Sequence, residues 1–205
     1  MEISIILAHP DKNSFNHAIA KMALQTLVKL GHVVNFHDLY DEKFNPILPC
    51  EEFSREASLD PLTLNHCREI ARACGIIIVH PNWWGQPPAM LKGWLDRVMR
   101  SGLAYKFAEG DSGAGIPIGL LSAKAALVFN TSNTLKQREQ QVFRDPLETL
   151  WKNCVFELCG IRLFHRRMFE VIVTSTPEQR QSWLTEVRET VTHHFPERSD
   201  ACSRV

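Results

Sequence analysis

The sequence predicts a single α/β domain built on a parallel sheet. Short apolar runs bounded by turn residues recur along the chain, and segments with helical spacing of apolar residues lie between them. The chain has 205 residues, 44% of them apolar, which is an ordinary size and composition for one domain. We expect the domain to span residues 1–195 and residues 196–205 to form a frayed tail.

The N-terminal half begins with a strand. Residues 3–8 are an apolar run that ends at His9-Pro10-Asp11, the pattern of a buried parallel strand. A helix is expected next, because apolar residues recur at helical spacing from Phe15 to Leu27 and Gly31 stands where a C-cap glycine closes a helix. Residues 32–39 predict a second strand, and a polar helix is expected over 61–73.

The C-terminal half continues the alternation. Residues 75–79 give the clearest buried strand, and a helix is expected over 89–100, followed by a long glycine-rich loop over 102–122. A further strand is predicted at 125–129, then a helix over 137–159 broken at Pro146. The last strand is expected at about 169–174 and the last helix at 177–194.

This alternation places the candidate site at one edge of the sheet. Five strands separated by helices predict a parallel sheet covered by helices on both faces, with right-handed crossovers. Ligands of such sheets bind beyond the carboxyl ends of the strands, where the strand order reverses. The rule selects the loops 9–16, 80–88 and 130–134.

Composition excludes several classes of protein. The 23 basic and 23 acidic side chains give no net charge, which argues against a nucleic-acid-binding protein. The six cysteines lack zinc or iron–sulfur spacing, so we expect no metal site, reduced thiols and a cytoplasmic protein. No apolar run reaches the roughly 20 residues of a membrane span, so no membrane insertion is expected.

Each of the three loops allows two interpretations. The loop 9–16 leads into a helix N-terminus, which binds phosphate well, but ordinary N-capping fits equally. Trp83 and Trp84 cannot both enter one core, so they indicate a flat aromatic ligand or a contact with a neighbouring subunit. The polar residues 130–134 either hydrogen-bond the edge of such a ligand or cap a helix.

Three blocks resemble the NAD(P)H:quinone oxidoreductase family of flavodoxin-like flavoproteins. They are Leu7-Ala-His-Pro-Asp-Lys-Asn-Ser-Phe-Asn16, Pro81-Asn-Trp-Trp-Gly-Gln-Pro-Pro-Ala-Met-Leu-Lys-Gly-Trp-Leu-Asp-Arg97 and Gly102-Leu-Ala-Tyr-Lys-Phe107. Mammalian quinone reductases, bacterial modulator-of-drug-activity proteins and the ancillary subunit of a bacterial potassium-efflux system belong to this family. The resemblance covers roughly the first 135 residues. It implies a flavodoxin-like three-layer sandwich with strand order 2-1-3-4-5.

The resemblance also implies a cofactor site and a dimer. A flavin phosphate would be held by His9, Ser14, Phe15 and Asn16. The flavin ring would lie along Pro81, Asn82, Trp83 and Trp84 and against Asn130, Thr131, Ser132 and Asn133. Members are homodimers with the active site at the subunit interface, so Tyr105 and Phe107 would cover the partner's pocket and act with Trp84 as the catalytic aromatic residues.

Two departures from the mammalian enzymes bear on the chemistry. Their Thr-Thr-Gly-Gly loop with a following tyrosine and histidine is replaced here by Asn130-Thr-Ser-Asn133 and then Leu-Lys-Gln-Arg-Glu, so backbone amides or Arg138 are the candidates to stabilise the reduced flavin. Phe107 replaces a tyrosine of the acceptor pocket. The chain also lacks the mammalian C-terminal extension, which favours FMN slightly over FAD.

The expected activity is two-electron reduction by ping-pong hydride transfer. NAD(P)H is the expected co-substrate, and quinones, azo compounds or nitro compounds are the expected acceptors. One alternative is a flavin-bound regulatory subunit of a potassium-efflux transporter. The other is an electron-carrier flavodoxin, which the zero net charge disfavours.

Overall fold

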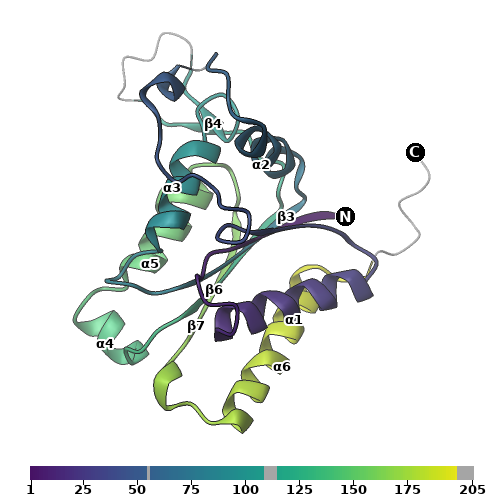
Figure 1. The fold of residues 1–205 in the computed structure, drawn as a ribbon, viewed down its shortest axis with the longest axis vertical. Helices are drawn as coiled ribbons and strands as arrows, with labels where there is room; N and C mark the ends of the chain where they lie inside the picture. Colours follow the sequence, from purple (N-terminus) through teal and green to yellow (C-terminus); the bar gives the residue numbers. More distant parts are fainter. Residues whose placement is uncertain (55, 109–114, 198–205) are drawn as a thin grey trace.

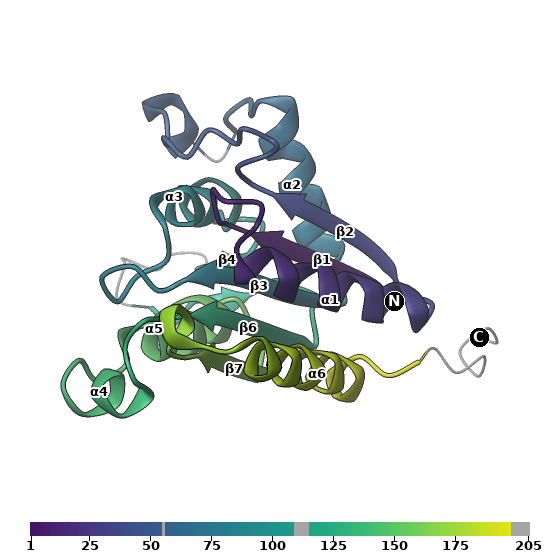
Figure 2. The same cartoon turned by 60° about the horizontal axis from the view of Figure 1, so that its bottom comes forward.

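A five-stranded parallel sheet forms the centre of the molecule. The computed structural model describes residues 1–54, 56–108 and 115–197. The strands of the sheet are β1 (Glu2–Leu7), β2 (Val33–Asp38), β3 (Gly75–Pro81), β6 (Ala125–Thr131) and β7 (Leu163–Phe169). They lie in the order β2-β1-β3-β6-β7, and every neighbouring pair is parallel (Figure 2). The predicted fold class and strand order are confirmed.

Helices cover both faces of this sheet (Figure 1). One face carries α1 (Phe15–Lys29) and α6 (Pro177–His194), which lie side by side. The other face carries α2 (Pro61–Arg72), α3 (Ala89–Val98), α5 (Pro146–Thr149) and the π-helical segment η2 (Leu150–Glu157). Each layer encloses a separate apolar core, and Trp94, Trp151 and Trp183 are buried in these cores.

The strands owe their apolar sequences to burial on both faces. Ile3, Ile5 and Leu7 of β1 pack toward α1 and α6, whereas Ile6 packs toward α2 and α3. Because side chains alternate between the two faces, a strand covered on both sides is apolar at nearly every position, and Ser4 is the buried exception in β1. This is why residues 3–8, 75–79 and 125–129 were recognisable as strands.

One predicted element was wrong. The last strand is Leu163–Phe169, and part of the segment 169–174 forms a short 3-10 turn, η3 (Ile172–Thr174). The helix predicted over 137–159 with a break at Pro146 is confirmed in outline, because α4 (Lys136–Gln141) ends before Pro146 and α5 and η2 follow from it. The chain turns between α4 and α5 through Arg144 and Asp145, whose φ angles are 61° and 47°. These left-handed backbone angles cannot continue a helix.

The predicted loop 102–122 also contains regular structure. Its two short strands, β4 (Tyr105–Lys106) and β5 (Ile118–Gly119), pair antiparallel. Residues 109–114 of this loop and residues 198–205 of the predicted tail lie outside the described residues. In the part of the chain that is described, no helix is both long and apolar enough to cross a bilayer.

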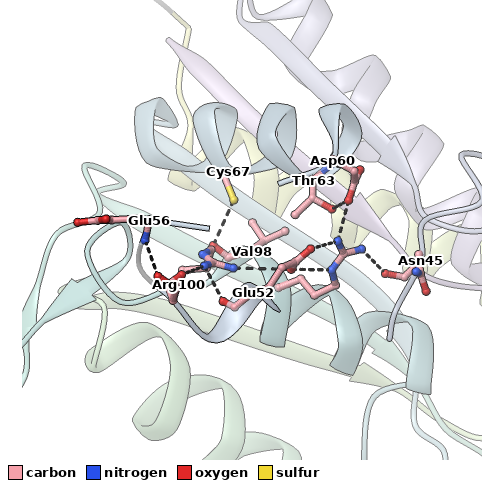
Figure 3. Close-up of polar contacts among 10 residues, drawn as sticks. Asn45, Glu52, Glu56, Asp60, Thr63, Cys67, Val98 and Arg100 are labelled. Carbon is pink, nitrogen blue, oxygen red and sulfur yellow. Dashed lines mark hydrogen bonds and ion pairs between the residues drawn. The ribbon is translucent and has the colours of Figure 1, made fainter. Parts of the chain in front are cut away.

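Arg97 fastens the connector between β2 and α2 to helix α3. Its guanidinium is buried, donates from Nε to Glu52 Oε2 at 3.0 Å, and donates to the carbonyl of Asn45 and to Asp60 Oδ2 at 2.7 Å each (Figure 3). Burial would raise the pKa of Asp60, but hydrogen bonds from Thr63 and Arg97 outweigh burial and lower that pKa to about 2. The short helix η1 (Cys50–Phe53) is thereby held beside α3.

Candidate functional site

A cavity of about 360 Å³ opens at the carboxyl edge of the sheet, where the segments after β1, β3 and β6 meet. Its walls are His9, Asn13, Ser14, Phe15, Asn16, Pro81, Asn82, Trp83, Thr131, Ser132, Asn133, Thr134, Ile172 and Arg180. The three loops selected from the sequence therefore form one site, as the rule for parallel sheets predicts. We call it the first cavity.

The N-terminus of α1 supplies the polar end of the first cavity. Ser14 is the N-cap, and its Oγ accepts from the backbone N–H of His17 at 3.4 Å. Phe15 turns the other way, into the core against Phe169 and Trp183. The N-terminal end of the helix dipole and the backbone N–H groups of its first turn favour an anion here.

Asn16 carries a buried polar atom without a partner among the described residues. Its side chain is 2% exposed, and Nδ2 donates to Thr131 Oγ1 at 2.9 Å, while Oδ1 accepts no hydrogen bond. Rotation of the amide by half a turn lets the Thr131 hydroxyl donate to Oδ1 and frees the NH₂ group. A buried polar group without a hydrogen-bond partner costs free energy. The unpaired atom of Asn16 therefore indicates that this cavity binds a ligand able to form a hydrogen bond with it.

His9 presents its imidazole ring to the same cavity. Its Nδ1 lies 3.1 Å from the backbone nitrogen and 3.3 Å from the carbonyl oxygen of Asp11, so the backbone of Asp11 holds this side of the ring. Burial lowers the pKa of His9, and the contact with the Asp11 carbonyl, which favours a proton on Nδ1, offsets part of this effect. The ring centroid lies 6.0 Å from that of Trp83.

Arg180 is a cavity residue that the sequence did not reveal. It comes from α6, and its guanidinium donates to Ser175 Oγ at 2.8 Å and to the carbonyl of Ile172 at 3.0 Å. The cation lies 5.8 Å from the centre of the Phe15 ring. No motif marks this position, because only the packing of α6 beside α1 brings Arg180 to the cavity.

Arg166 has a structural role beside the cavity. Its side chain is 4% exposed, and it bonds both Asp145 oxygens at 2.8 and 2.9 Å. It also donates to Asn130 Oδ1 at 2.9 Å. Asn130 is therefore buried beside Arg166 and does not line the first cavity, whereas the next three residues do.

Trp83 and Trp84 lie in a tight turn with left-handed backbone at its centre. Trp83 and Gln86 exchange two backbone hydrogen bonds of 3.0 Å, and the φ angles are 57° at Trp84 and 72° at Gly85. Such an angle is costly for a bulky residue, yet the Trp84 side chain is fully exposed. Packing within the chain therefore does not compensate for the strained backbone of Trp84. Backbone strain of this kind is typical of functional sites.

Two backbone N–H groups of this loop already donate hydrogen bonds within the chain. The N–H of Asn82 donates to the carbonyl of Thr131 at 2.7 Å, and that of Trp83 donates to Gln86. Neither of these two N–H groups is free to bind the edge of a ring. The bond from Asn82 to Thr131 instead joins the loops after β3 and β6.

A second cavity of about 520 Å³ adjoins the first. Asn82 and Thr134 line both, and Trp84, Gly85, Glu139, Phe143 and Pro146 complete the second. Glu139 is 3% exposed and accepts from Asn82 Nδ2 at 2.8 Å. Arg138, the side chain considered from the sequence, is exposed and lies over the Phe143 ring at 5.4 Å.

Tyr105 and Phe107 lie apart from both cavities within one chain. Their rings meet edge to face at 5.8 Å, and Tyr105 packs against the core beneath α3. The three predicted catalytic aromatic residues are therefore divided, since only Trp84 lines one of the two cavities.

A cluster of histidine and glutamate outside the two cavities does not suit a metal ion. His37, Glu42 and His66 place three ligand atoms within 4.8 Å of one another. However, the two nitrogens of His37 contact Glu42 and Glu69, and Trp94 Nε1 donates to His66 Nδ1 at 2.9 Å. The His66 proton therefore sits on Nε2, facing Glu42, and neither ring offers a free lone pair.

The family of the chain follows from its sequence and fold. A family model described as a flavodoxin-like fold matches residues 1–194. The chain belongs to this flavodoxin-like family. It is 38% identical over 170 residues to an uncharacterized NAD(P)H oxidoreductase of Haemophilus influenzae, a match that covers 80% of this chain and 81% of the relative. The resemblance to NAD(P)H:quinone oxidoreductases is confirmed.

Two further proteins extend this comparison. The chain is 27% identical over 199 residues to NAD(P)H dehydrogenase [quinone] 1 of Rattus norvegicus, covering 86% of this chain and 71% of the rat protein. Its fold is similar to that of an FMN-dependent NADH-azoreductase of Bacillus anthracis in complex with FMN. That match has a TM-score of 0.76 at 21% identity and covers 94% of this chain and 98% of the azoreductase.

Proposed function

We propose that this chain is a flavin-dependent NAD(P)H oxidoreductase that reduces quinones or similar electrophilic acceptors, two electrons at a time in a ping-pong sequence. The observation that carries the proposal is the first cavity, where a helix N-terminus, a guanidinium and a buried amide group with one unpaired polar atom meet beside an indole. The names of the relatives support the use of NAD(P)H and of a quinone.

The residues of the first cavity fit a flavin phosphate. Ser14, Asn16, His9 and Arg180 are donors to an anion, and the first turn of α1 adds its N–H groups. We assign the ring system to the segments 81–84 and 131–133. The neighbour with bound FMN supports FMN, and the single guanidinium among the cavity residues matches one phosphate group.

The protein supplies binding, orientation and exclusion of water. When bound, a flavin accepts a hydride from NAD(P)H and passes it to the acceptor. Glu139 holds the Asn82 side chain, which lines both cavities, and so fixes the loop that carries the two indoles. The exposed Trp84 offers an aromatic face to a flat co-substrate such as a nicotinamide, a quinone, an azo compound or a nitro compound.

A homodimer completes this site in our proposal. Tyr105 and Phe107 do not line the two cavities of their own chain, and the Trp84 side chain is exposed to solvent. Tyr105 and Phe107 of one subunit would cover the pocket of the other, which would bury Trp84 and exclude water from the reacting groups.

The test begins with the visible absorption spectrum of the purified protein. We expect a yellow protein that releases FMN on heating and is bleached by anaerobic NADPH directly to the two-electron reduced form. Asn16→Asp, which places a carboxylate against the phosphate, should weaken FMN binding at least about tenfold. Gln25→Glu is the matched control, because it makes the same charge change on the exposed side of α1. A colourless protein that also refuses added flavin would contradict the proposal.

A further inference from the structure

A chain of three polar side chains lies behind the first cavity. Ser14 Oγ lies 3.0 Å from His17 Nδ1, and His17 Nε2 lies 2.9 Å from Asp38 Oδ2. Ser14 lines the cavity, whereas His17 and Asp38 do not. The side chains of His17 and Asp38 are 17% and 14% exposed, so their contact is largely shielded from water.

The contact with Asp38 limits the possible protonation states of His17. An acceptor oxygen at 2.9 Å requires a proton on Nε2, because two lone pairs would otherwise face each other. The neutral imidazole then has a bare Nδ1, which takes the hydroxyl proton of Ser14. The charged imidazole instead donates from Nδ1 to Ser14 Oγ, and the Ser14 hydroxyl is free to donate elsewhere.

The neutral and charged states of His17 differ in whether Ser14 can donate a hydrogen bond to an anion in the cavity. In the neutral state, Ser14 offers only lone pairs to an anion, which are repulsive. In the charged state, Ser14 Oγ accepts from His17 and offers its O–H to the anion. The anion therefore favours the charged form of His17, and by linkage the charged form favours the anion.

The other charged groups near His17 leave Asp38 as its direct partner. Lys12 is paired with Asp41, and the backbone N–H groups of Tyr40 and Asp41 hold the second oxygen of Asp38 at 3.2 and 3.3 Å. From the loop after β1, the His9 ring lies 6.4 Å from that of His17, and His9 bonds the backbone of Asp11. Burial favours the neutral form of His9.

We propose that His17 is a positioning residue, which takes up a proton when a phosphate group binds at Ser14 and thereby turns the Ser14 hydroxyl into a donor. The proton comes from solvent, and no covalent bond changes. The inference rests on the proposed function only in identifying the phosphate as that of a flavin. Asp38 accepts from His17 Nε2 in this arrangement and so keeps Nδ1 of the ring directed toward Ser14.

Titration calorimetry of the flavin-free full chain tests the inference. FMN and riboflavin, which differ only in the phosphate, are titrated near neutral pH in two buffers with different enthalpies of protonation. The comparison gives the number of protons taken up. His17→Gln keeps a polar side chain that cannot titrate, and His193→Gln, at an exposed position on α6, is the matched control.

With FMN, we expect the wild type to take up more protons than His17→Gln. We also expect the FMN dissociation constant to be about tenfold higher for the variant than for the wild type. Protons that the FMN phosphate itself gains or loses on binding contribute equally in both proteins, so they cancel from the difference in proton uptake. With riboflavin, the two proteins should agree within about twofold in affinity and show the same proton count.

Equal proton uptake by wild type and His17→Gln on binding FMN would overturn the inference and leave the proposed function intact. Failure of the wild type to bind either flavin would overturn both. Asp38→Asn is the second variant, because it keeps a side chain of the same shape and removes the charge. It should lower proton uptake like His17→Gln, and unchanged uptake would contradict the role of Asp38.

Discussion

The opposite pKa shifts of His80 and His37 follow from burial and from the groups that contact each ring. Trp151 Nε1 donates to His80 Nε2 at 3.0 Å, and His80 Nδ1 donates to the carbonyl of Pro81 at 2.7 Å. Burial lowers the pKa of His80 to about 3, so it is neutral. His37 is the opposite case, because Glu42 and Glu69 contact its two nitrogens and outweigh the burial that would lower its pKa, so the pKa is raised.

The Glu42 contacts give a prediction for stability against pH. Burial would raise the pKa of Glu42, but hydrogen bonds from His37 and His66 lower it from 4.5 to about 2. Its contribution is therefore present above pH 4.5 and is lost as the pH falls toward 2. The contribution of His37, whose pKa is raised from 6.5, is complete below pH 6.5 and is lost as the pH rises through the raised value.

We expect Glu42→Gln to lower the free energy of unfolding by about 2 kcal/mol between these two limits, and by less at lower and higher pH. Urea unfolding at several pH values measures the difference from wild type. Glu189→Gln, at an exposed position on α6, should show little change at any pH. A difference that stays constant with pH would contradict the assignment.

At the scale of elements, the close contact between the backbones of Gly93 in α3 and Pro46 in the connector before α2 sets how these two segments pack. A Cβ added at Gly93 would lie 2.1 Å from the carbonyl oxygen of Pro46, and backbone cannot move aside as a flexible side chain can. The same connector is tied to α3 by Arg97, through Asn45 and Glu52. Gly93 is therefore required by packing, although glycine weakens a helix.

We expect Gly93→Ala to destabilise the protein by at least about 1 kcal/mol. Overpacking costs roughly 1–3 kcal/mol or more, whereas the better helix propensity of alanine returns only about 1 kcal/mol. Urea unfolding with Lys92→Ala as the control checks this, because Lys92 is exposed and its pair with Asp96 contributes little. Equal stability of Gly93→Ala and wild type would show that α3 can shift away from Pro46.

At the scale of the whole molecule, the first cavity exists only in the folded chain. It joins the ends of β1, β3 and β6 to α6, so its donors come from segments far apart in sequence. A ligand that binds there stabilises the fold by mass action, because the unfolded chain cannot assemble these groups.

FMN at about 100 times its dissociation constant should therefore add about 2.7 kcal/mol and raise Tm by roughly 5–10 °C. Thermal unfolding followed by circular dichroism, with and without FMN, measures the shift. Asn16→Asp should show a smaller shift at the same FMN concentration. An unchanged Tm of the wild type at saturating FMN would contradict binding to the folded state.

The sequence by itself determined the α/β alternation and the edge of the sheet where the candidate site lies. Strands buried on both faces are apolar at nearly every position, so 3–8, 75–79 and 125–129 were evident. Strand β7 was misplaced because it lies at the edge of the sheet and contains Arg166 and Arg167, whose charges are balanced by distant residues. Local patterns do not record such long-range pairs.

Tertiary structure alone decided which side chains reach the first cavity. Side chains alternate between the faces of β6, so Thr131 meets Asn16 while Asn130 turns to Arg166 on the other face. Arg180 and Asp38 come close to the α1 N-terminus only because α6 and β2 pack beside α1. Such contacts arise from packing between elements, and no spacing within a motif predicts them.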